Sequence, residues 1–434
     1  MRSLSKNILH TIFTQIPSLI ISIVSGIFLT RLLGPEGKGV FAVYVANVEI
    51  LALLFSLGTE QGIVYFISNK KIKVEKILGI AIIVYLISVI ANFFIIFFLN
   101  IRILFVSQYD EFFFRAYIFI IFVITFFNSL MIAFLKAKKR FDVINKVSIL
   151  GASLNLLVFS VLFFLYKNNY IKNSIYLIFS LLVALSVVNI VIYVLAFRVE
   201  YKIKPSFDFK KTELFAFLKF TIPGYWGMLV NFLNYRLDIW IVQYFKGTYQ
   251  LGLYVLAVNF SQLVMMLSKI VASVTIPYLS ENDKKQRQEI FLVYSRINFL
   301  MIFVLVSVLF FVGEYLLVFL YGVDFIGSIG PFRILIVGMI FTGASQLFSS
   351  YLYSSGRNDL CLYANLTGLF FTVILDLTLI PKYGIIGSAY ATFFSYLSIF
   401  IVYISILKIK ERFYFTDLFI IKKSDIKIKK VNEK

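Results

Sequence analysis

The stretch LHTIFTQIPSLIISIVSGIFLTRLL, at residues 9–33, decides the fold class of this chain. Apolar side chains dominate about 25 consecutive positions, and a transmembrane helix needs roughly 20 of them. A signal peptide has a shorter apolar region followed by a small-residue cleavage site, and this stretch has neither feature. We therefore predict that residues 9–33 form a retained first membrane span.

The rest of the 434 residues has the same membrane character. Apolar residues make up 60% of the chain and charged residues 15%, whereas soluble domains average about 45–50% and 25%. Stretches of spanning length recur along the whole sequence. We expect an all-α polytopic membrane protein with twelve transmembrane helices, at residues 9–33, 39–68, 77–100, 113–135, 147–166, 174–197, 213–243, 251–279, 291–312, 331–354, 360–380 and 384–407.

Lys and Arg are unevenly distributed over the segments that connect these spans. With the N-terminus inside, the cytoplasmic segments hold about 30 of the 42 Lys and Arg residues, and the outer segments together with the outer ends of the spans hold about ten. Cytoplasmic loops of membrane proteins carry such an excess of cations. We expect a multi-pass protein of the bacterial cytoplasmic membrane, with both termini in the cytoplasm.

The same distribution explains the net charge of +20 without a nucleic-acid partner, and we expect none. A single Cys and a single His exclude a disulfide scaffold, a zinc site of the usual ligands and a Cys–His nucleophile pair. The segment Gly34–Gly39 superficially resembles a phosphate-binding P-loop, but it lacks the required spacing and the Ser or Thr after Gly-Lys. We expect no metal, no cofactor and no catalytic residue.

The two halves of the chain resemble each other. Residues of the same or similar type recur in the same order at offsets of 213 or 217 residues: Gly34 and Gly247, Gly39 and Gly252, Phe41 and Tyr254, Arg140 and Arg357, Asp142 and Asp359, Gly151 and Gly368. Parallel repeats with an even number of spans enter the membrane the same way, and substrate sites lie between them. We predict an N-terminal six-helix bundle at residues 1–200, a cytoplasmic linker at 201–212, a C-terminal six-helix bundle at 213–407 and a basic cytoplasmic tail at 408–434.

A proline lies within the first helix of each half, at Pro17 and Pro223. Proline removes a hydrogen bond from the helical ladder. We predict a bend or a partly unwound point at both positions, where membrane transporters can place ligands. A kink with no ligand role is the alternative.

Polar residues at helical spacing form stripes in the first two spans of each half. These stripes are Thr11, Gln15, Ser18, Ser22 and Ser25 in span one, Glu49, Ser56 and Glu60 in span two, Thr221, Gly224, Asn231, Asn234 and Asp238 in span seven, and Asn259, Gln262, Lys269 and Ser273 in span eight. A lone Ser or Asn in a membrane helix usually serves packing. A charge at the centre of a span costs about 2.5–3.5 kcal/mol, so Glu49 and Lys269 indicate a cavity or a partner. Arg31, Arg236 and Asp238 lie toward the outer ends, where they could also snorkel to the interface.

Four segments resemble the Wzx-type oligosaccharide flippases of the MOP exporter superfamily, to which the MATE exporters and the lipid II flippases also belong. They are Arg31–Phe41, the pair Tyr235–Asp238 and Gly252–Tyr254, and Pro381–Ala389. The likeness covers nearly the whole chain in the same order. It implies two six-helix bundles that form a V around a central cavity.

The resemblance also implies a function. A transporter of this family moves an undecaprenyl-pyrophosphate-linked oligosaccharide repeat unit across the cytoplasmic membrane by alternating access, for O-antigen, capsule or exopolysaccharide synthesis. Membrane lipid, a polysaccharide polymerase and the assembly machinery would be its partners. A cationic lumen is implied for the family, and the candidates for contact with pyrophosphate or sugar are Lys269, Arg236, Arg31, Asn231, Asn234, Gln262, Asn259 and Gln15. Candidates for coupling to protons or sodium are Glu49, Glu60 and Asp238.

Two other functions stay open. A MATE-like exporter of cationic drugs, driven by protons or sodium, would have acidic residues and no cations in its lumen. Glu49 and Glu60 favour this exporter, and Lys269 opposes it. A membrane polysaccharide polymerase or glycosyltransferase could use the acidic pair Asp110 and Glu111. The short outer loops oppose that enzyme, because its acidic pair normally lies in the first outer loop beside a large outer domain.

Overall fold

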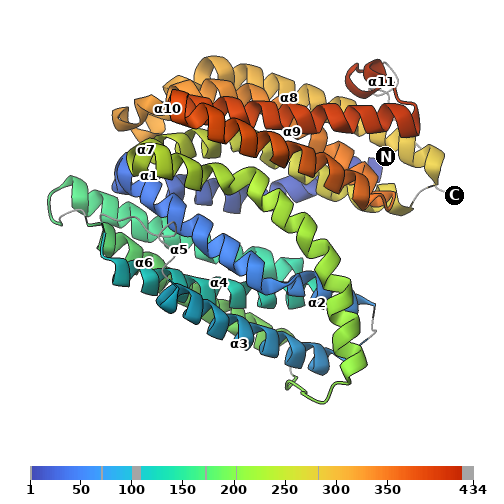
Figure 1. Cartoon of the computed structure of the whole chain (residues 1–434). Helices are drawn as coiled ribbons and strands as arrows, with labels where there is room; N and C mark the ends of the chain where they lie inside the picture. Colours follow the sequence, from blue (N-terminus) through green and yellow to red (C-terminus); the bar gives the residue numbers. More distant parts are fainter. Residues whose placement is uncertain are drawn as a thin grey trace. The chain divides into compact units, whose positions relative to one another are not determined.

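The computed structural model describes residues 2–69, 72–99, 109–171, 174–201, 203–281 and 283–422, without the side chains of residues 2–16, 223, 224, 277 and 281. Every regular element in these ranges is a helix (Figure 1). The helices are α1 (Arg2–Ser56), α2 (Thr59–Ser68), α3 (Val74–Phe98), α4 (Glu111–Ala137), α5 (Phe141–Lys167), α6 (Ile175–Glu200), α7 (Lys211–Glu281), α8 (Lys284–Tyr321), the 3-10 helix η2 (Val323–Ser328), α9 (Ile329–Ser354), α10 (Asn358–Glu411) and α11 (Phe415–Phe419).

Nine helices within the described ranges are long and apolar enough to cross a membrane. Three of them, in α1, α7 and α10, contain a glycine with a positive φ angle, at Gly34 (63°), Gly247 (78°) and Gly384 (61°). Glycine adopts this conformation without the steric cost that other residues meet. Each of these glycines separates two segments of about spanning length, so the structure is consistent with twelve spans. The predicted all-α polytopic fold is confirmed.

The second predicted span, residues 39–68, is not one continuous helix. Helix α1 ends at Ser56 and α2 begins at Thr59, because Leu57 and Gly58 have φ angles of 47° and 73°. A Cβ atom on Gly58 would lie only 2.8 Å from the carbonyl oxygen of Thr221. The prediction of an unbroken span is therefore wrong at this point, where close packing against α7 accompanies the break.

The prolines do not unwind their helices. Helix α1 keeps helical dihedral angles through Pro17, and α7 keeps them through Pro223, with Gly34 and Gly247 as the positions that depart from helical values. The predicted unwound point is therefore absent at both prolines, and a bend there stays a prediction. Ser and Thr side chains and neighbouring groups can satisfy the carbonyl that a membrane proline leaves free.

The chain divides into two compact units. The N-terminal unit comprises Pro17–Leu33 and Val40–Phe232, and the C-terminal unit comprises Met1–Ile16, Gly34–Gly39 and Leu233–Lys434. The division of the sequence at residues 201–212, the arrangement of the bundles in a V and the role of residues 408–434 stay predictions. Residues 423–434 of the tail lie outside the described part.

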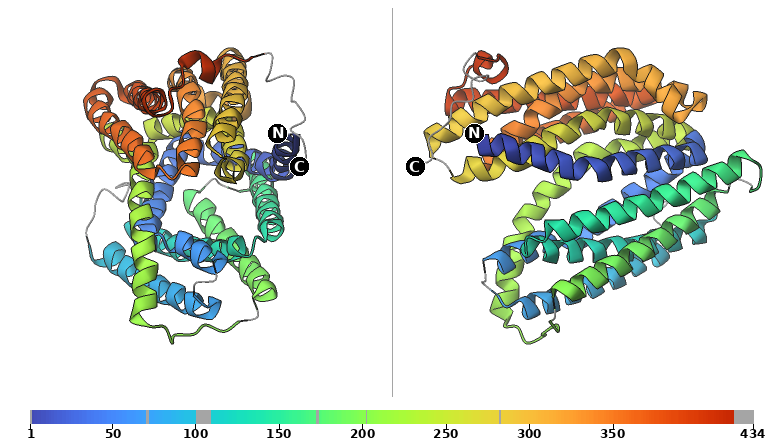
Figure 2. Two further views of the ribbon diagram at one scale, coloured as in Figure 1. Left: turned by 90° about the vertical axis from the view of Figure 1, so that its right-hand side faces the viewer. Right: turned by 180° about the vertical axis from the view of Figure 1, so that it is seen from behind.

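Helix α4 is the centre of the N-terminal unit, where it packs against α2, α3, α5 and α6 (Figure 2). Tyr44 stacks on Phe114 with ring centroids 4.4 Å apart, and Phe179 meets Phe114 edge-on at 5.0 Å. The start of α7 is held to α3 by an ion pair of 3.0 Å between Lys76 Nζ and Glu213 Oε2. Aromatic packing of this kind orders the core beyond the burial of apolar area.

In the C-terminal unit, α9 packs between α8 and α10 (Figure 1). Phe291 lies 4.4 Å from Tyr351 between ring centroids, and both side chains are buried. The short helix α11 closes this core against α8, because Leu418 and Phe419 are buried and Arg296 Nη1 donates to the Asp417 carbonyl oxygen at 2.7 Å.

One ion pair recurs in both halves. Arg140, at the N-cap of α5, lies 2.6 Å from Glu200 at the end of α6. Arg357, at the N-cap of α10, lies 3.0 Å from Glu411 at the end of the same helix. In each half, the pair joins the start of the predicted fifth span to the end of the sixth. This matched contact supports the internal repeat.

A matched pair of glycines packs backbone against backbone. A Cβ atom on Gly39 would lie 1.9 Å from the Thr248 carbonyl oxygen, and one on Gly252 would lie 1.7 Å from the Pro35 carbonyl oxygen. No larger side chain fits at either position without moving the main chain. This contact explains why glycine recurs at both places in the repeat.

Candidate functional site

Two buried carboxylates lie close together in the C-terminal unit. Asp238 of α7 and Asp376 of α10 are 6% and 0% exposed, and their negative charges lie close enough to interact. The hydroxyl of Tyr254 donates to Asp238 Oδ2 at 2.6 Å and lies 3.0 Å from Thr392 Oγ1. These four residues form what we call the carboxylate cluster.

The carboxylate cluster has more acceptors than donors. Asp238 Oδ1 and both carboxylate oxygens of Asp376 are buried without a hydrogen-bond partner among the described residues. Nearby on α7, the Asn234 Nδ2 group donates to the Asn365 carbonyl oxygen at 2.7 Å, while its own Oδ1 is buried without a partner. Burying unpaired carboxylates costs several kcal/mol per ion. A proton or an oxygen-binding cation would remove that cost.

Sequence reasoning found Asp238 but missed Asp376, Tyr254 and Thr392. Asp376 is the one acidic residue in the predicted span 360–380. An ionisable residue inside a membrane span is a functional candidate by default, and that signal was sufficient to find it. Tyr254 and Thr392 carry no such signal, because hydroxyl residues are common in membrane helices.

Other predicted residues gather around the buried Tyr396 of α10. Gln262 lies near the Tyr396 side chain, and the charge of Arg236 acts on both Tyr396 and Asp238. Tyr235 and Tyr396 have ring centroids 6.0 Å apart. The structure therefore brings Arg236, Asp238 and Gln262 together.

The predicted stripe of span eight coincides with an uncovered face of α7. Asn259, Lys269 and Ser273 are exposed and Gln262 is half-buried, whereas the intervening Ser261, Val264, Ser268 and Ala272 are buried. Asn231, farther toward the N-terminus of α7, is also exposed. The polar side of this helix segment is thus the side that the C-terminal unit does not cover.

The remaining candidates belong to the N-terminal unit, apart from Gln15, whose side chain lies outside the described part. Glu60 accepts a hydrogen bond of 2.7 Å from Ser129 Oγ, and it lies in the first turn of α2, where the helix dipole favours a negative charge. Glu49 is half-buried in α1. The guanidinium of Arg31 lies 5.9 Å from the centre of the Phe163 ring. These contacts do not join Glu49, Glu60 and Arg31 into one cluster.

Comparison with known proteins gives a family and a fold. A family model described as "Polysaccharide biosynthesis protein" matches residues 4–283. Two curated relatives come from Methanocaldococcus jannaschii: the uncharacterized membrane protein MJ1375 is 27% identical over 54% of this chain and 59% of its own length, and the uncharacterized membrane protein MJ1068 is 26% identical over 65% and 55%. This chain therefore spans less than two thirds of either relative.

Solved structures share the fold at low sequence identity. An inward closed conformation of the lipid II flippase MurJ has a TM-score of 0.74 at 18% identity, over 94% of this chain and 89% of that chain. An inward-facing multidrug resistance MATE family transporter of the MOP superfamily has a TM-score of 0.70 at 14% identity, over 90% and 95%. A MOP superfamily transporter from Pyrococcus furiosus has a TM-score of 0.62 at 14% identity, over 93% of each chain.

Proposed function

This chain belongs to the polysaccharide biosynthesis protein family, and we propose that it carries undecaprenyl-pyrophosphate-linked oligosaccharide repeat units from the inner to the outer leaflet of the cytoplasmic membrane. The family match and the likeness in fold to MurJ and a MATE transporter support a multi-pass membrane transporter of the MOP superfamily rather than an enzyme. The family match carries the proposal, and the uncovered polar face of α7 supports it.

The physical problem in such transport is the headgroup. Sugar hydroxyls that enter hydrocarbon lose their water without replacement partners, at a cost of several kcal/mol each. A polar path restores those hydrogen bonds, while the polyprenyl tail remains in the bilayer. Asn231, Asn259 and Gln262 supply amides for such a path, and they lie on exposed or half-buried positions of α7.

Lys269 and Arg236 are the residues that we assign to the pyrophosphate. Lys269 is an exposed cation on α7, and a lysine meets phosphate as a point charge. Arg236 can bind two phosphate oxygens at once, because its guanidinium has a planar fork of donors. Asn234 is buried, its Nδ2 group donates to the Asn365 carbonyl oxygen of α10 at 2.7 Å, and its Oδ1 has no hydrogen-bond partner in the part of the chain that the structure describes. Arg31 and Gln15 in the first predicted span would complete the contacts to the headgroup.

Transport in one direction needs an energy source. The outward movement of an anionic headgroup across an inside-negative membrane releases about 2.3 kcal/mol per charge per 100 mV. Binding of a proton or sodium ion at the carboxylate cluster would add a second source, since Asp238 and Asp376 together hold three buried oxygens without a hydrogen-bond partner among the described residues. Glu49 and Glu60 are weaker candidates for coupling, because Glu60 is already hydrogen-bonded to Ser129.

The location follows from the same proposal. We place both termini in the cytoplasm, where the Lys- and Arg-rich segments favour them. The flipped repeat unit would then reach a polysaccharide polymerase and its assembly machinery on the outer side.

Deletion of the gene tests the proposed function. Cells without the protein should accumulate lipid-linked repeat units on the cytoplasmic side and lose the corresponding surface polysaccharide. Lipid extraction and surface staining measure the two effects, and a plasmid copy of the wild-type gene should reverse both. Unchanged surface polysaccharide would contradict the proposal.

A second candidate is a cation-coupled drug exporter. It is favoured by the buried carboxylates and by the likeness in fold to MATE transporters, with a TM-score of 0.70. The exposed Lys269 opposes it, because a cationic side chain repels a cationic drug. Raised drug sensitivity with normal surface polysaccharide in the deletion strain would favour this candidate over the flippase.

A further inference from the structure

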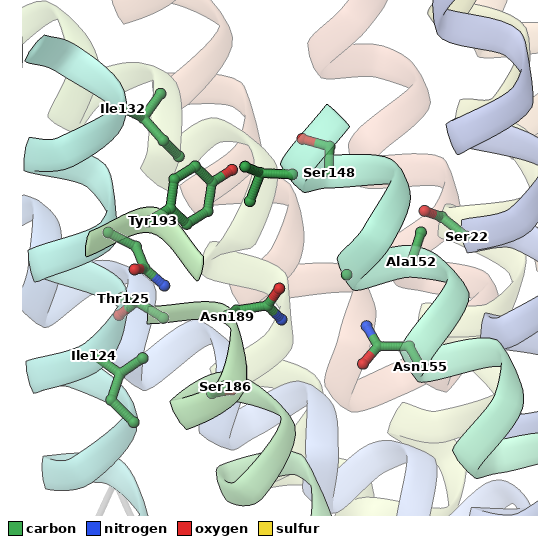
Figure 3. Close-up of a pocket in the computed structure, with 13 residues that line it drawn as sticks. Ser22, Ile124, Thr125, Ile132, Ser148, Ala152, Asn155, Ser186, Asn189 and Tyr193 are labelled. Carbon is green, nitrogen blue, oxygen red and sulfur yellow. The ribbon is translucent and has the colours of Figure 1, made fainter. Parts of the chain in front are cut away.

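The N-terminal unit contains a pocket away from the residues considered so far. It has a volume of about 360 Å³, and it is lined by residues of α4, α5 and α6 together with Ser22 of α1 (Figure 3). Pockets for small molecules typically hold roughly 300–1,000 Å³. The space is therefore sufficient for a small ligand or for part of a larger one.

The lining of this pocket is polar without being charged. Three carboxamides line it, Asn128 of α4, Asn155 of α5 and Asn189 of α6, and none of its described lining residues is charged. Five hydroxyl groups accompany them, from Ser22, Thr125, Ser148, Ser186 and Tyr193. Three amides from three helices meet at one place in a unit that is otherwise strongly apolar.

The amides are placed to meet a ligand. In Figure 3, Asn155 and Asn189 extend from neighbouring helices toward the same space. Asn128 Oδ1 is buried without a hydrogen-bond partner among the described residues. Gly151 makes room for Asn189, because a Cβ atom at Gly151 would lie 2.5 Å from Asn189 Oδ1.

The hydroxyl groups add acceptors. Ser22 and Ser186 each donate to a carbonyl oxygen of the preceding turn at 2.8 Å, and Thr125 does so at 2.7 Å. Their protons are thus used within the helix, and their oxygen lone pairs remain for a ligand. Together with the amides, which both donate and accept, the pocket offers a mixed set of partners.

This chemistry selects an uncharged ligand with many hydroxyl groups. An anion would find no cation among the described lining residues, and an apolar molecule would leave the half-buried amides without hydrogen-bond partners. A sugar hydroxyl both donates and accepts a hydrogen bond, which matches a carboxamide. We propose that this pocket binds one sugar of the transported headgroup, separately from the residues that bind pyrophosphate. The inference rests on the proposed function, since it assigns a part of the same substrate.

The test compares two lipids on the purified full-length protein in nanodiscs. One probe is undecaprenyl pyrophosphate, and the other is the same lipid with N-acetylglucosamine attached; calorimetric titration gives both dissociation constants. We expect the wild-type protein to bind the sugar-bearing lipid at least about tenfold more tightly, because several hydrogen bonds of about 1 kcal/mol each are added. Asn189→Leu and Asn155→Leu should reduce this ratio to near one while the affinity for the sugar-free lipid stays the same.

Asn145→Leu is the matched control, because Asn145 lies on the same helix as Asn155 but does not line the pocket. It should keep the tenfold ratio. Gly151→Ala provides a second test of the pocket through its contact with Asn189, and thermal unfolding shows whether each variant is folded. If either Asn variant unfolds, protection of Asn155→Cys from a thiol reagent by the sugar-bearing lipid, in a Cys361→Ser background, replaces it.

The outcomes separate the two proposals. If the wild-type protein binds the two lipids with equal affinity, the pocket does not recognise the sugar. If the folded Asn189→Leu and Asn155→Leu variants keep the tenfold preference for the sugar-bearing lipid, sugar recognition lies elsewhere. Either result overturns the inference and leaves the proposed function standing. If the wild-type protein binds neither lipid, both the inference and the proposed function are overturned.

Discussion

The two halves of this chain share glycines with unusual backbone angles at matching positions but differ in the chemistry of their interiors. Gly34 and Gly247 both end a helix with a positive φ angle, 63° and 78°. The interior of the N-terminal unit holds uncharged amides in a pocket, whereas that of the C-terminal unit holds a pair of buried carboxylates. Matched backbones with unlike side chains fit a division of the proposed transport between the two halves.

One repeated glycine shows this difference at the level of atoms. A Cβ atom on Gly151 would lie 2.5 Å from Asn189 Oδ1, and a Cβ atom on the matching Gly368 would lie 2.5 Å from Ile399 Cδ1. The same close approach of helices thus meets a polar partner in one half and an apolar partner in the other. We interpret the N-terminal half as the part that recognises sugar and the C-terminal half as the part that couples transport to a cation.

The largest expected effect comes from removing a charge in the carboxylate cluster. Asp376→Asn should lower cation-driven transport about 5- to 150-fold, the range of a typical coupling free energy of 1–3 kcal/mol. The physical reason is that one carboxylate alone attracts the cation less than two. Transport measured with and without a sodium or proton gradient checks this prediction. Asp359→Asn is the control. Asp359 is an exposed carboxylate at the start of the same helix, so its substitution should change cation-driven transport little. Full gradient dependence in Asp376→Asn would contradict the assignment of coupling to the C-terminal half.

The two matched glycines should respond differently to the same substitution. Gly368→Ala crowds Ile399 in an apolar contact, so it should destabilise the folded protein by about 1–3 kcal/mol without changing preference for the sugar-bearing lipid. Gly151→Ala should reduce that preference as well, because it displaces Asn189. Thermal unfolding and lipid titration on the same preparations separate the effects. An equal loss of sugar preference in both variants would remove the distinction between the halves.

The last comparison concerns the repeated ion pair and affects stability alone. The Glu411 side chain is 3% exposed and that of Glu200 is 11% exposed. Arg357→Ala should therefore cost about 1.5–3 kcal/mol of stability, and Arg140→Ala should cost less because its pair is more exposed to solvent. Lys284 and Gln288 also contact Glu411, which keeps the first effect from being larger. Thermal midpoints of both variants in one detergent give the comparison, and a greater loss in Arg140→Ala would contradict it.

The sequence predicts the membrane spans well because apolar runs of about 20 residues have few alternatives in a bilayer. The breaks at Gly34, Gly247 and Gly384 fall at or beside the predicted ends of spans. The break at Leu57 and Gly58 escaped prediction, because Leu57 is apolar and the pattern continues through it. A close contact with Thr221 accompanies the break, and a one-dimensional pattern cannot contain that contact.

The candidate sites were less predictable for a related reason. Charged residues within spans stand out, which is how Asp238 and Lys269 were found, and Asp376 could have been found in the same way. The amides of the N-terminal pocket could not, because Asn128, Asn155 and Asn189 lie singly on three helices. A lone Asn in a membrane helix normally indicates packing. Only the tertiary structure shows that these three amides share one space.

Flipping by the purified protein is the most direct test of the central claim. Proteoliposomes are prepared with an undecaprenyl-pyrophosphate-linked saccharide in both leaflets, and a glycosidase that cannot cross the membrane is added outside. Without flipping, the enzyme cleaves only the outer half of the lipid-linked saccharide. We predict that wild-type protein raises cleavage to nearly all of it, and that Lys269→Ala reduces the rate at least about tenfold through the lost pyrophosphate contact. Cleavage that stops at half with the folded wild-type protein would contradict the account.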